Sequence, residues 1–460
     1  MACHVAVIDL GKTNSKVALV DTATATEVQL LTQAAVVNSE TLYPSLDHAA
    51  IETFIIDALC VLAAHQTIDA ITITTHGATA ALINTAGRLV LPVIDYEFSG
   101  IDETRDAYNL LRPAFADTGS PALPGGLNIG AQLYWQQSRH PKQFADASTL
   151  LTWPQYWVHL LCGERHNDVT SLGCHSDLYE PRHQRYSSLV DSINLRSLMP
   201  ATRHSGQLSG TLRASIAKST GLRATTPVYT GIHDSNASLV PHLIARDTAY
   251  SVVSTGTWFI AMAIGGAPTS LDENKDTLLN VNARGRSVPS ARFMGGRERE
   301  LLGVSDVATD QAMNRLLDDK QLPTMLMPSM VTGTGPYPNS ENQWVGTEAQ
   351  DDKPRLHCAV TLYLAMMTHE CMLLIGSRGP TYIEGPLAHD KYYARMLAAV
   401  SQRPVFTSTS RTGTSVGAAM LISPPKQLPR YDLIELDETE RHNLERYARS
   451  WREQLRVHTR

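Results

Sequence analysis

The sequence lacks three features that would place the chain in a specialised class. It has no Cys-x-x-Cys pair, and its six scattered cysteines favour buried, reduced thiols over a disulfide framework. It has no strong charge of either sign: a formal net charge of -6 excludes both a basic nucleic-acid-binding surface and an acidic disordered chain. It also lacks a secretory apolar segment and any apolar run near the roughly 20 residues of a membrane span. We therefore expect a cytoplasmic protein with no nucleic-acid or membrane partner.

What the chain does have is length and an ordinary globular composition. Its 460 residues are 43% hydrophobic and 18% charged. A chain of this size can bury a large core and normally divides into two domains.

The most informative stretch runs from Pro227 to Ser238. A short apolar strand ends at Gly231, and Asp234 follows where a loop opens into a helix. A carboxylate at a strand end is typical of a general base, which makes Asp234 a catalytic candidate. A helix-capping aspartate next to an ordinary hairpin explains the same pattern, and the residues alone leave the two readings about even.

Two hairpins carry hydroxyl-rich turns that suit phosphate. Ser251–Met262 encloses Thr255, Gly256 and Thr257, and Val5–Asp21 encloses Gly11, Lys12, Thr13 and Asn14. Such turns offer backbone N–H donors to an anion, and Asp9, at the end of the preceding strand, can hold Mg²⁺ through waters. No helix opening with Gly-Lys-Ser/Thr follows, so this is not the Walker pattern. Two such hairpins in one chain predict a duplicated fold that clasps a nucleotide.

The residues that could contact a hydroxylated substrate are less specific. His76 and Gly77 end a strand that begins at Ala70, and Asp95 ends a predicted strand over Leu89–Glu97. A lone histidine is more often structural, and Asp95 could equally be a solvated loop carboxylate. Trp135, on a predicted helix over Leu127–His140, could belong to the core or to a ligand site. A metal site at His369-Glu370 is rejected because the H-E-x-x-H pattern is incomplete.

In order and spacing these elements resemble the FGGY carbohydrate kinase family, over nearly the whole chain to about Ser423. Thr75-His76-Gly77 is similar to the xylulokinase branch, and His233-Asp234 to the rhamnulokinase branch. The chain departs from the family pattern at Lys12 and Asn14, and Glu384-Gly385-Pro386 replaces a glycine-rich segment. The resemblance implies an α/β, two-domain actin-like ATPase (ribonuclease H-like) fold with an interdomain cleft. The implied domains are residues 1–242 and 243–430, with a C-terminal helix in residues 431–460.

The resemblance also assigns roles to the candidate residues. It implies that Asp234 is the catalytic base, that Asp9 and Asp234 are the Mg²⁺ ligands, and that both hairpins hold ATP phosphates. The implied nucleotide-binding residues are Gly11, Lys12, Thr13, Asn14, Thr255, Gly256, Thr257, Gly385 and Gly413. The implied substrate-binding residues are His76, Gly77, Asp95, Trp135 and Asp234.

The leading hypothesis is therefore an ATP-dependent sugar kinase that acts on a ketose (pentulose or hexulose) or related polyol, with ATP and Mg²⁺ as cofactors. Its domains are expected to close on the sugar, and a homodimer is possible. The alternative is a nucleotide- or sugar-binding regulatory protein of the same fold without kinase turnover, suggested by Glu384-Gly385-Pro386. A hydrolase that uses His233-Asp234 ranks last, because no nucleophile elbow or metal pair accompanies it. The loops at 294–298 and 332–338 receive no role.

Overall fold

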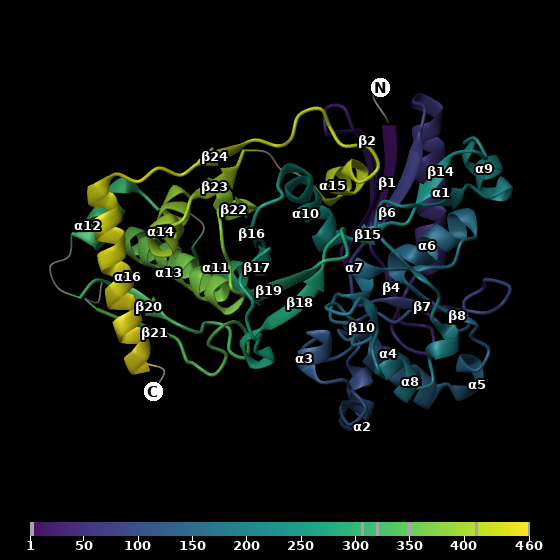
Figure 1. Cartoon of the computed structure of the whole chain (residues 1–460), viewed down its shortest axis with the longest axis horizontal. Coiled ribbons are helices and arrows are strands. Elements are labelled where there is room, and N and C mark those ends of the chain that lie inside the picture. The colour runs from purple at the N-terminus through teal and green to yellow at the C-terminus, as the bar shows by residue number, and fades with distance from the viewer. Residues whose placement is uncertain (1–3, 305–307, 319–321, 347–351, 410–412, 459–460) are drawn as a thin grey trace. The chain divides into compact units, whose positions relative to one another are not determined.

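The computed structural model describes residues 4–304, 308–318, 322–346, 352–409 and 413–458, and Figure 1 shows the course of the chain. The chain forms two compact units, each assembled from separate segments of the sequence. The first unit contains residues 1–246, 279–287 and 412–428, and the second contains residues 247–278, 288–411 and 429–460. Two short segments of the second half therefore complete the first unit, which no local sequence pattern indicated.

The elements of the first unit alternate between strands and helices. Its strands are β1 (His4–Leu10), β2 (Asn14–Asp21), β3 (Thr26–Ala34), β4 (Val37–Asn38), β5 (Ser45–Leu46), β6 (Ala70–Thr75), β7 (Ala80–Ile83), β8 (Thr149–Thr152), β9 (Asn167–Asp168), β10 (Tyr179–Glu180), β11 (Arg185–Tyr186), β12 (Thr202–Arg203), β13 (Leu208–Thr211), β14 (Pro227–Tyr229) and β15 (Ile232–His233). Its helices are α1 (His48–His65), η1 (Ser99–Thr104), α2 (Arg105–Asn109), α3 (Phe115–Thr118), α4 (Ile129–Arg139), α5 (Pro141–Phe144), α6 (Trp153–Cys162), α7 (Val169–Leu172), α8 (Leu189–Ser192), η2 (Arg196–Leu198), α9 (Ala214–Thr220), α10 (Asp234–Ala245) and α15 (Thr414–Met420).

The main sheet of the first unit has seven strands in the order β13-β14-β6-β1-β2-β3, with β15 also paired to β6. The β1–β2 hairpin is antiparallel, and β6 runs parallel to β1. Strand β15 is parallel to β6, with Ile232 opposite Thr74 and His233 opposite Thr75. Because parallel strands end at the same edge of a sheet, the residues that follow β6 and β15 meet there.

Helix α1 covers part of this sheet. Its Ile51, Ile55 and Leu59 join the core formed by β1, β2 and β6, because their spacing places them on one helix face. By length and composition alone α1 is apolar enough to span a membrane. Its buried face packs on the sheet instead, as expected for a core helix of a globular unit.

The second unit repeats this construction. Its strands are β16 (Tyr250–Thr255), β17 (Phe259–Ile264), β18 (Thr277–Val281), β19 (Ser287–Phe293), β20 (Met325–Met327), β21 (Gln343–Val345), β22 (Thr381–Glu384), β23 (Val405–Ser408) and β24 (Tyr431–Leu433). Its helices are η3 (Glu273–Lys275), α11 (Gly295–Leu301), α12 (Asp310–Leu317), α13 (Lys353–Leu374), η4 (Pro386–His389), α14 (Lys391–Ser401) and α16 (Glu438–His458).

The seven-stranded sheet of the second unit has the order β18-β19-β17-β16-β22-β23-β24. As in the first sheet, an antiparallel hairpin, here β16–β17, continues into parallel strands, here β22 and β23. The predicted α/β fold, with two actin-like domains, is confirmed. The shared strand order also bears out the duplication that the two hairpins suggested.

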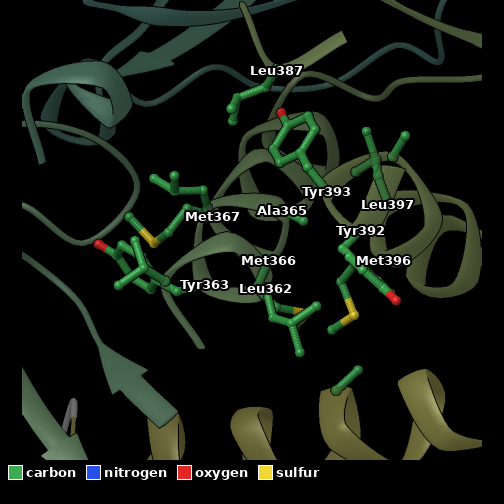
Figure 2. Packing of buried hydrophobic residues seen from close by; sticks show 14 of the residues in the cluster. Leu362, Tyr363, Ala365, Met366, Met367, Leu387, Tyr392, Tyr393, Met396 and Leu397 are labelled. Carbon is green, nitrogen blue, oxygen red and sulfur yellow. The ribbon is translucent and has the colours of Figure 1, made fainter. Parts of the chain in front are cut away.

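Helices α13 and α14 form the centre of the second core. Figure 2 shows side chains of both helices in this core, among them Leu362 and Met366 of α13 and Tyr393 and Met396 of α14. Helix α13 is buried almost all round, which is why its apolar residues show little one-sided periodicity. Met side chains fill irregular gaps in such a core.

In two segments of the first unit a short strand precedes a helix. Residues 149–161 divide into two elements, because β8 comes first and α6 begins at Trp153, followed by Pro154 at a position that favours a helix start. The polar segment from Arg182 to Leu198 carries many exposed residues, yet Leu189 and Val190 of α8 are fully buried.

Candidate active site

Asp234 lies at the junction of β15 and α10, as the sequence predicted. It is the first residue of the helix, after the N-cap residue His233. Gly231 makes this position possible: its φ is +79°, and a Cβ there would lie 2.7 Å from the backbone oxygen of Ile73. The Asp234 side chain is 27% exposed. Its Oδ1 accepts hydrogen bonds from Ser235 N at 2.5 Å and Ser235 Oγ at 3.3 Å.

His76 directly follows β6, so it lies at the same sheet edge as Asp234. Its Nδ1 is 2.9 Å from Gly77 O, and a carbonyl can only accept, so Nδ1 carries the proton in the neutral ring. The bare Nε2 can then accept a hydrogen bond from a hydroxyl. Burial lowers the pKa of His76 and raises the pKa of Asp234, while the charges of the two groups oppose both shifts.

Lys12 is directed toward carboxylates. Its Nζ forms an ion pair with Asp95 Oδ1, lies 3.2 Å from Glu97 Oε2 and sits 4.7 Å from the centre of the Tyr96 ring. The edge of His76 contacts the same tyrosine, with ring centroids 5.3 Å apart. Lys12, Asp95, Tyr96 and His76 therefore form one polar cluster, which we call the acceptor cluster.

The strand expected over Leu89–Glu97 is wrong. Only the isolated bridges Ile83–Leu89 and Ser45–Ile94 occur there in the described structure. Pro92 has no N–H to donate to a ladder, which interrupts pairing. Asp95 is instead held by a turn, in which Asp95 N donates to Pro44 O and Phe98 N donates to Asp95 O.

Asp9, near the end of β1, is buried beside α15. Its Oδ2 accepts a hydrogen bond from Thr414 Oγ1 at 2.6 Å, and its register partner on β2 is Lys16. Burial raises the pKa of Asp9 to about 6, which outweighs the opposing effect of Thr414. Gly413 is the N-cap residue of α15, so the structure places it in the first unit beside Asp9.

The turn after β1 is closed by a hydrogen bond from Gly11 N to Asn14 O at 2.9 Å. Thr13 and Asn14 are exposed at its tip. The second hairpin has the same design, with Gly256 and Thr257 exposed between β16 and β17. Both predicted hairpins are thus present, with polar groups and backbone donors at their tips.

A cavity of about 350 Å³ opens beside the second hairpin. Its lining residues come from the hairpin, α11 and η4; they are Thr255, Gly256, Thr257, Phe259, Gly296, Arg299, Glu300, Val304, Pro386 and Leu387. Gly296 allows α11 to approach the turn of the second hairpin, because a Cβ at position 296 would lie 2.2 Å from Gly256 O. The unassigned loop at 294–298 therefore forms the start of a helix in the cavity wall.

Thr255 and Gly385 brace this cavity. Thr255 Oγ1 donates to Glu384 O at 2.6 Å and accepts from Leu387 N at 3.1 Å. Gly385 has φ +84°, and a Cβ there would lie 2.8 Å from Thr255 O. The hydroxyl of Thr255 is thus committed to the protein, whereas Gly256 and Thr257 are exposed.

Trp135 lies in the core of the first unit. It is 5% exposed and makes edge contacts with Tyr43 and Phe98, with ring centroids 5.2 and 5.3 Å apart. The structure does not bring Trp135 together with the acceptor cluster. A cavity of about 670 Å³ in the same unit, between residues 38–52, 87–92 and Tyr156, has none of the candidate residues in its wall.

The profile of the FGGY carbohydrate kinase N-terminal domain matches residues 4–241, and that of the FGGY carbohydrate kinase C-terminal domain matches residues 247–430. The chain belongs to the FGGY family of carbohydrate kinases. A carbohydrate kinase from Novosphingobium aromaticivorans has 35% identity, with 99% of each chain covered and a TM-score of 0.91. A xylulose kinase from Rhodospirillum rubrum, at 19% identity and a TM-score of 0.77 over 99% of this chain and 98% of its own, shares the FGGY fold.

An L-fuculokinase from Salmonella typhi is 29% identical to this FGGY chain over 201 residues, which are 43% of this chain. The matched part spans only 42% of that relative's length. FGGY sugar kinases use ATP with Mg²⁺ as the phosphoryl donor.

The residues of this chain fit the binding of ATP with Mg²⁺. No group of three or more possible metal-ligating side chains occurs among the residues that the structure describes. Mg²⁺ that arrives with nucleotide needs only one or two carboxylates, since phosphates and waters complete its shell. Asp9 satisfies that requirement beside the first hairpin.

Sequence reasoning missed Tyr96, Thr414 and Arg299 as neighbours of the candidate residues. Tyr96 was missed because it was placed within the predicted strand over Leu89–Glu97. Its position between Asp95 and Glu97 could have marked it as a neighbour of the candidate residue Asp95. No local signal connects Thr414 to Asp9 or Arg299 to Thr257.

Proposed function

We propose that the chain is an ATP-dependent sugar kinase that transfers the γ-phosphate to a hydroxyl of a ketose (pentulose or hexulose) or related polyol. The observation that carries the proposal is the common edge of β6 and β15, where Asp234 and His76 follow paired residues. A carboxylate base and a hydroxyl-binding imidazole at one edge suit an alcohol acceptor. The names of the relatives point to fuculose and xylulose, both ketoses.

In this mechanism Asp234 accepts the proton of the attacking hydroxyl. Its raised pKa makes it a better base than an exposed aspartate, and the neutral His76 Nε2 orients a neighbouring hydroxyl. The exposed hairpin tips, with Thr13 and Asn14 in the first and Thr257 in the second, would hold the phosphate anion without large reorganisation. When bound, ATP with Mg²⁺ supplies the phosphoryl group and neutralises its charge. Positioning accounts for most of the expected acceleration.

The acceptor cluster argues for a neutral acceptor. Lys12 is already paired with Asp95 and lies 3.2 Å from the exposed Glu97, so these three groups together carry a formal charge of −1 and offer no unpaired cation to a sugar acid. The fold alone does not decide whether the acceptor is neutral or acidic, because the structural neighbours include a gluconate kinase and a glycerol kinase. Cytoplasmic location and a homodimer stay predictions.

The test is an ADP-release screen of the purified full chain over ketoses, polyols, aldoses and sugar acids. We expect turnover with a ketose and its near-complete loss in Asp234→Ala, with ATP–Mg²⁺ binding retained by calorimetry. Near-normal turnover of Asp234→Ala contradicts the base assignment, and a clear preference for glycerol or an aldose contradicts the ketose assignment. ATP binding without turnover on any acceptor favours the regulatory alternative.

A further inference from the structure

Gln132 is a buried polar side chain that the mechanism above does not use. It lies on α4 and is 2% exposed, and its helix neighbours Ala131 and Leu133 belong to the core of the first unit. Its side-chain Nε2 donates to Ala78 O at 2.6 Å and also to Gly126 O. An amide nitrogen has two N–H groups, so both donors of this side chain are used.

The first of these carbonyls belongs to the turn that carries His76. Ala78 lies two residues after His76 in the sequence and has φ +54°, a left-handed conformation that a residue with a Cβ rarely adopts. The turn connects the end of β6 at Thr75 to the start of β7 at Ala80. A backbone in such a conformation persists only where its surroundings hold it, and the hydrogen bond from Gln132 holds Ala78 O.

The second carbonyl belongs to the loop that packs on Tyr96. Gly126 N donates to Tyr96 O at 2.9 Å, and a Cβ at position 126 would lie 2.9 Å from Tyr96 Cα. Only glycine permits such a close approach of two backbones. Gln132 therefore reaches Tyr96 through Gly126, and it reaches the turn of His76 through Ala78.

The two segments that Gln132 holds meet at the acceptor cluster. The rings of His76 and Tyr96 are in edge contact, with centroids 5.3 Å apart. Within the part of the chain that the structure describes, no hydrogen bond links residues 76–78 directly to residues 95–97. The hydrogen-bonded connection between the two segments thus runs through the amide of Gln132.

We propose that Gln132 is a positioning residue for the sugar: by binding both segments it fixes His76 and Tyr96 relative to each other. This inference rests on the proposed function, because it takes the acceptor cluster as the place where the sugar hydroxyls bind. Gln132 itself is not a catalytic residue, since its two N–H groups are occupied by Ala78 O and Gly126 O.

Gln136, one turn further along α4, offers a matched control. It is 5% exposed, and its Nε2 also donates twice, to Tyr43 Oη at 2.7 Å and to Pro92 O at 3.3 Å. Pro92 O accepts a second hydrogen bond from Tyr43 Oη at 2.7 Å, so its segment stays held when the Gln136 amide is removed. Loss of either amide should lower the melting temperature, but only Gln132 binds the turn of His76.

The kinetic test compares Gln132→Met with Gln136→Met in the full chain. Methionine has a similar length and donates no hydrogen bond, so Gln132→Met releases both segments. Misplacement of a bound reactant costs on the order of 10–100-fold in rate, and kcat/KM for the preferred ketose should fall by about that factor. The Kd of ATP–Mg²⁺, measured by calorimetry, should stay within about threefold, because Gln132 contacts neither hairpin. Gln136→Met should keep both values.

The second test reads the position of His76 without substrate. NMR of the chain with isotope-labelled histidine, assigned by the signal missing in His76→Ala, reports the ring, because the aromatic ring of Tyr96 beside it changes its chemical shift. Gln132→Met should move this signal, and Gln136→Met should leave it in place. Gly126→Ala keeps Gln132 but displaces Tyr96, so it should move the signal and lower kcat/KM as well. It decides the question if Gln132→Met does not fold.

The outcomes separate this inference from the proposed function. If the native chain shows no sugar-dependent ADP release, or if Asp234→Ala keeps it, the function fails, while the His76 signal still tests the connection through Gln132. If the native chain is active but Gln132→Met keeps its kcat/KM, or Gln136→Met loses as much, the positioning role is wrong. Equal losses of sugar and ATP affinity in Gln132→Met also contradict it. A His76 signal unchanged in both Gln132→Met and Gly126→Ala overturns the inference directly.

Discussion

At the scale of single residues, burial controls the two carboxylates that the proposed kinase reaction needs. Asp9 is 6% exposed, and its pKa is raised from 3.8 to about 6, mainly by desolvation. A carboxyl whose folded-state pKa is raised stabilises the fold only while it is protonated. That contribution is present below about pH 4 and is lost as the pH rises through 6. Ionised Asp9 thus lowers the stability of the fold at neutral pH, and the proposed Mg²⁺ binding requires this ionised form.

Asp9→Asn should therefore stabilise the protein at pH 8 and have almost no effect below about pH 4. The shift of about two pKa units corresponds to a gain of about 1–3 kcal/mol in the free energy of unfolding at pH 8. Asparagine can still accept the Thr414 hydrogen bond, so the packing is preserved. Denaturant titrations at both pH values, without nucleotide or Mg²⁺, measure the difference. A difference independent of pH would show that Asp9 is not strained by burial.

His76→Ala should raise the KM for the sugar far more than the KM for ATP. The neutral ring offers Nε2 to an acceptor hydroxyl, and losing one such hydrogen bond costs about 1 kcal/mol or more, which is roughly fivefold in KM. Steady-state kinetics with each substrate varied in turn provides the measurement. Equal changes in both KM values would instead indicate that His76 supports the sheet edge as a whole.

At the scale of elements, α15 joins the proposed base to the proposed metal ligand. It packs on α10, which begins with Asp234, and its Thr414 binds Asp9. The contact with α10 depends on Gly417, because a Cβ there would lie 2.0 Å from Ala237 O. A glycine inside a helix normally destabilises the protein by about 0.5–1 kcal/mol relative to alanine. At position 417 glycine is instead the more stable residue, because the close packing leaves no room for a Cβ.

Gly417→Ala should destabilise the first unit by about 1–3 kcal/mol and reduce kcat, since it separates α15 from α10. Gly413→Ala is the matched control. Gly413 has an ordinary φ of −76°, and only Glu27 Oε1, at 3.7 Å, lies near its added Cβ, so its effect should stay within about 0.5 kcal/mol. The melting temperatures of both variants, measured by thermal unfolding, test this difference in stability. Equal melting temperatures would mean that the helices can separate without cost.

Elements with strong local signals were predictable. Apolar runs and turn residues, which act over a few positions, predict the β1–β2 and β16–β17 hairpins and the start of α10 after Gly231. The long helix α13 follows from its apolar composition in the same way. Short strands before α6 and α9 were not predictable, because a few apolar residues fit either state. The acceptor cluster could not be predicted for another reason. Lys12 pairs with Asp95, which lies 83 residues away in the sequence, and only the tertiary fold brings the two together.

At the scale of the whole molecule, segments distant in sequence complete the first unit. Residues 279–287 add Val281 to the core around α4, and residues 412–428 supply α15. The family resemblance supplied the fold, but no pattern in the sequence indicated which unit these segments join.

Replacing residues 413–428 with a Gly/Ser linker of equal length should therefore destabilise the first unit and spare the second. Limited proteolysis followed by mass spectrometry should show early cleavage within residues 4–246 and slower cleavage within residues 288–304 and 352–409. The native chain is the control. Equal protection of the two units in the variant would contradict the division.

The hydrogen bond from Thr414 to Asp9 joins positions 405 residues apart. In a chain synthesised from its N-terminus at about 5–20 residues per second, roughly 20–80 s separate the appearance of the two partners. During that interval the nascent polypeptide carries β1 without the helix that covers Asp9. An early stop codon, even one that removes only the last tenth of the chain, would leave the half that holds the proposed base permanently open to proteases and dependent on chaperones.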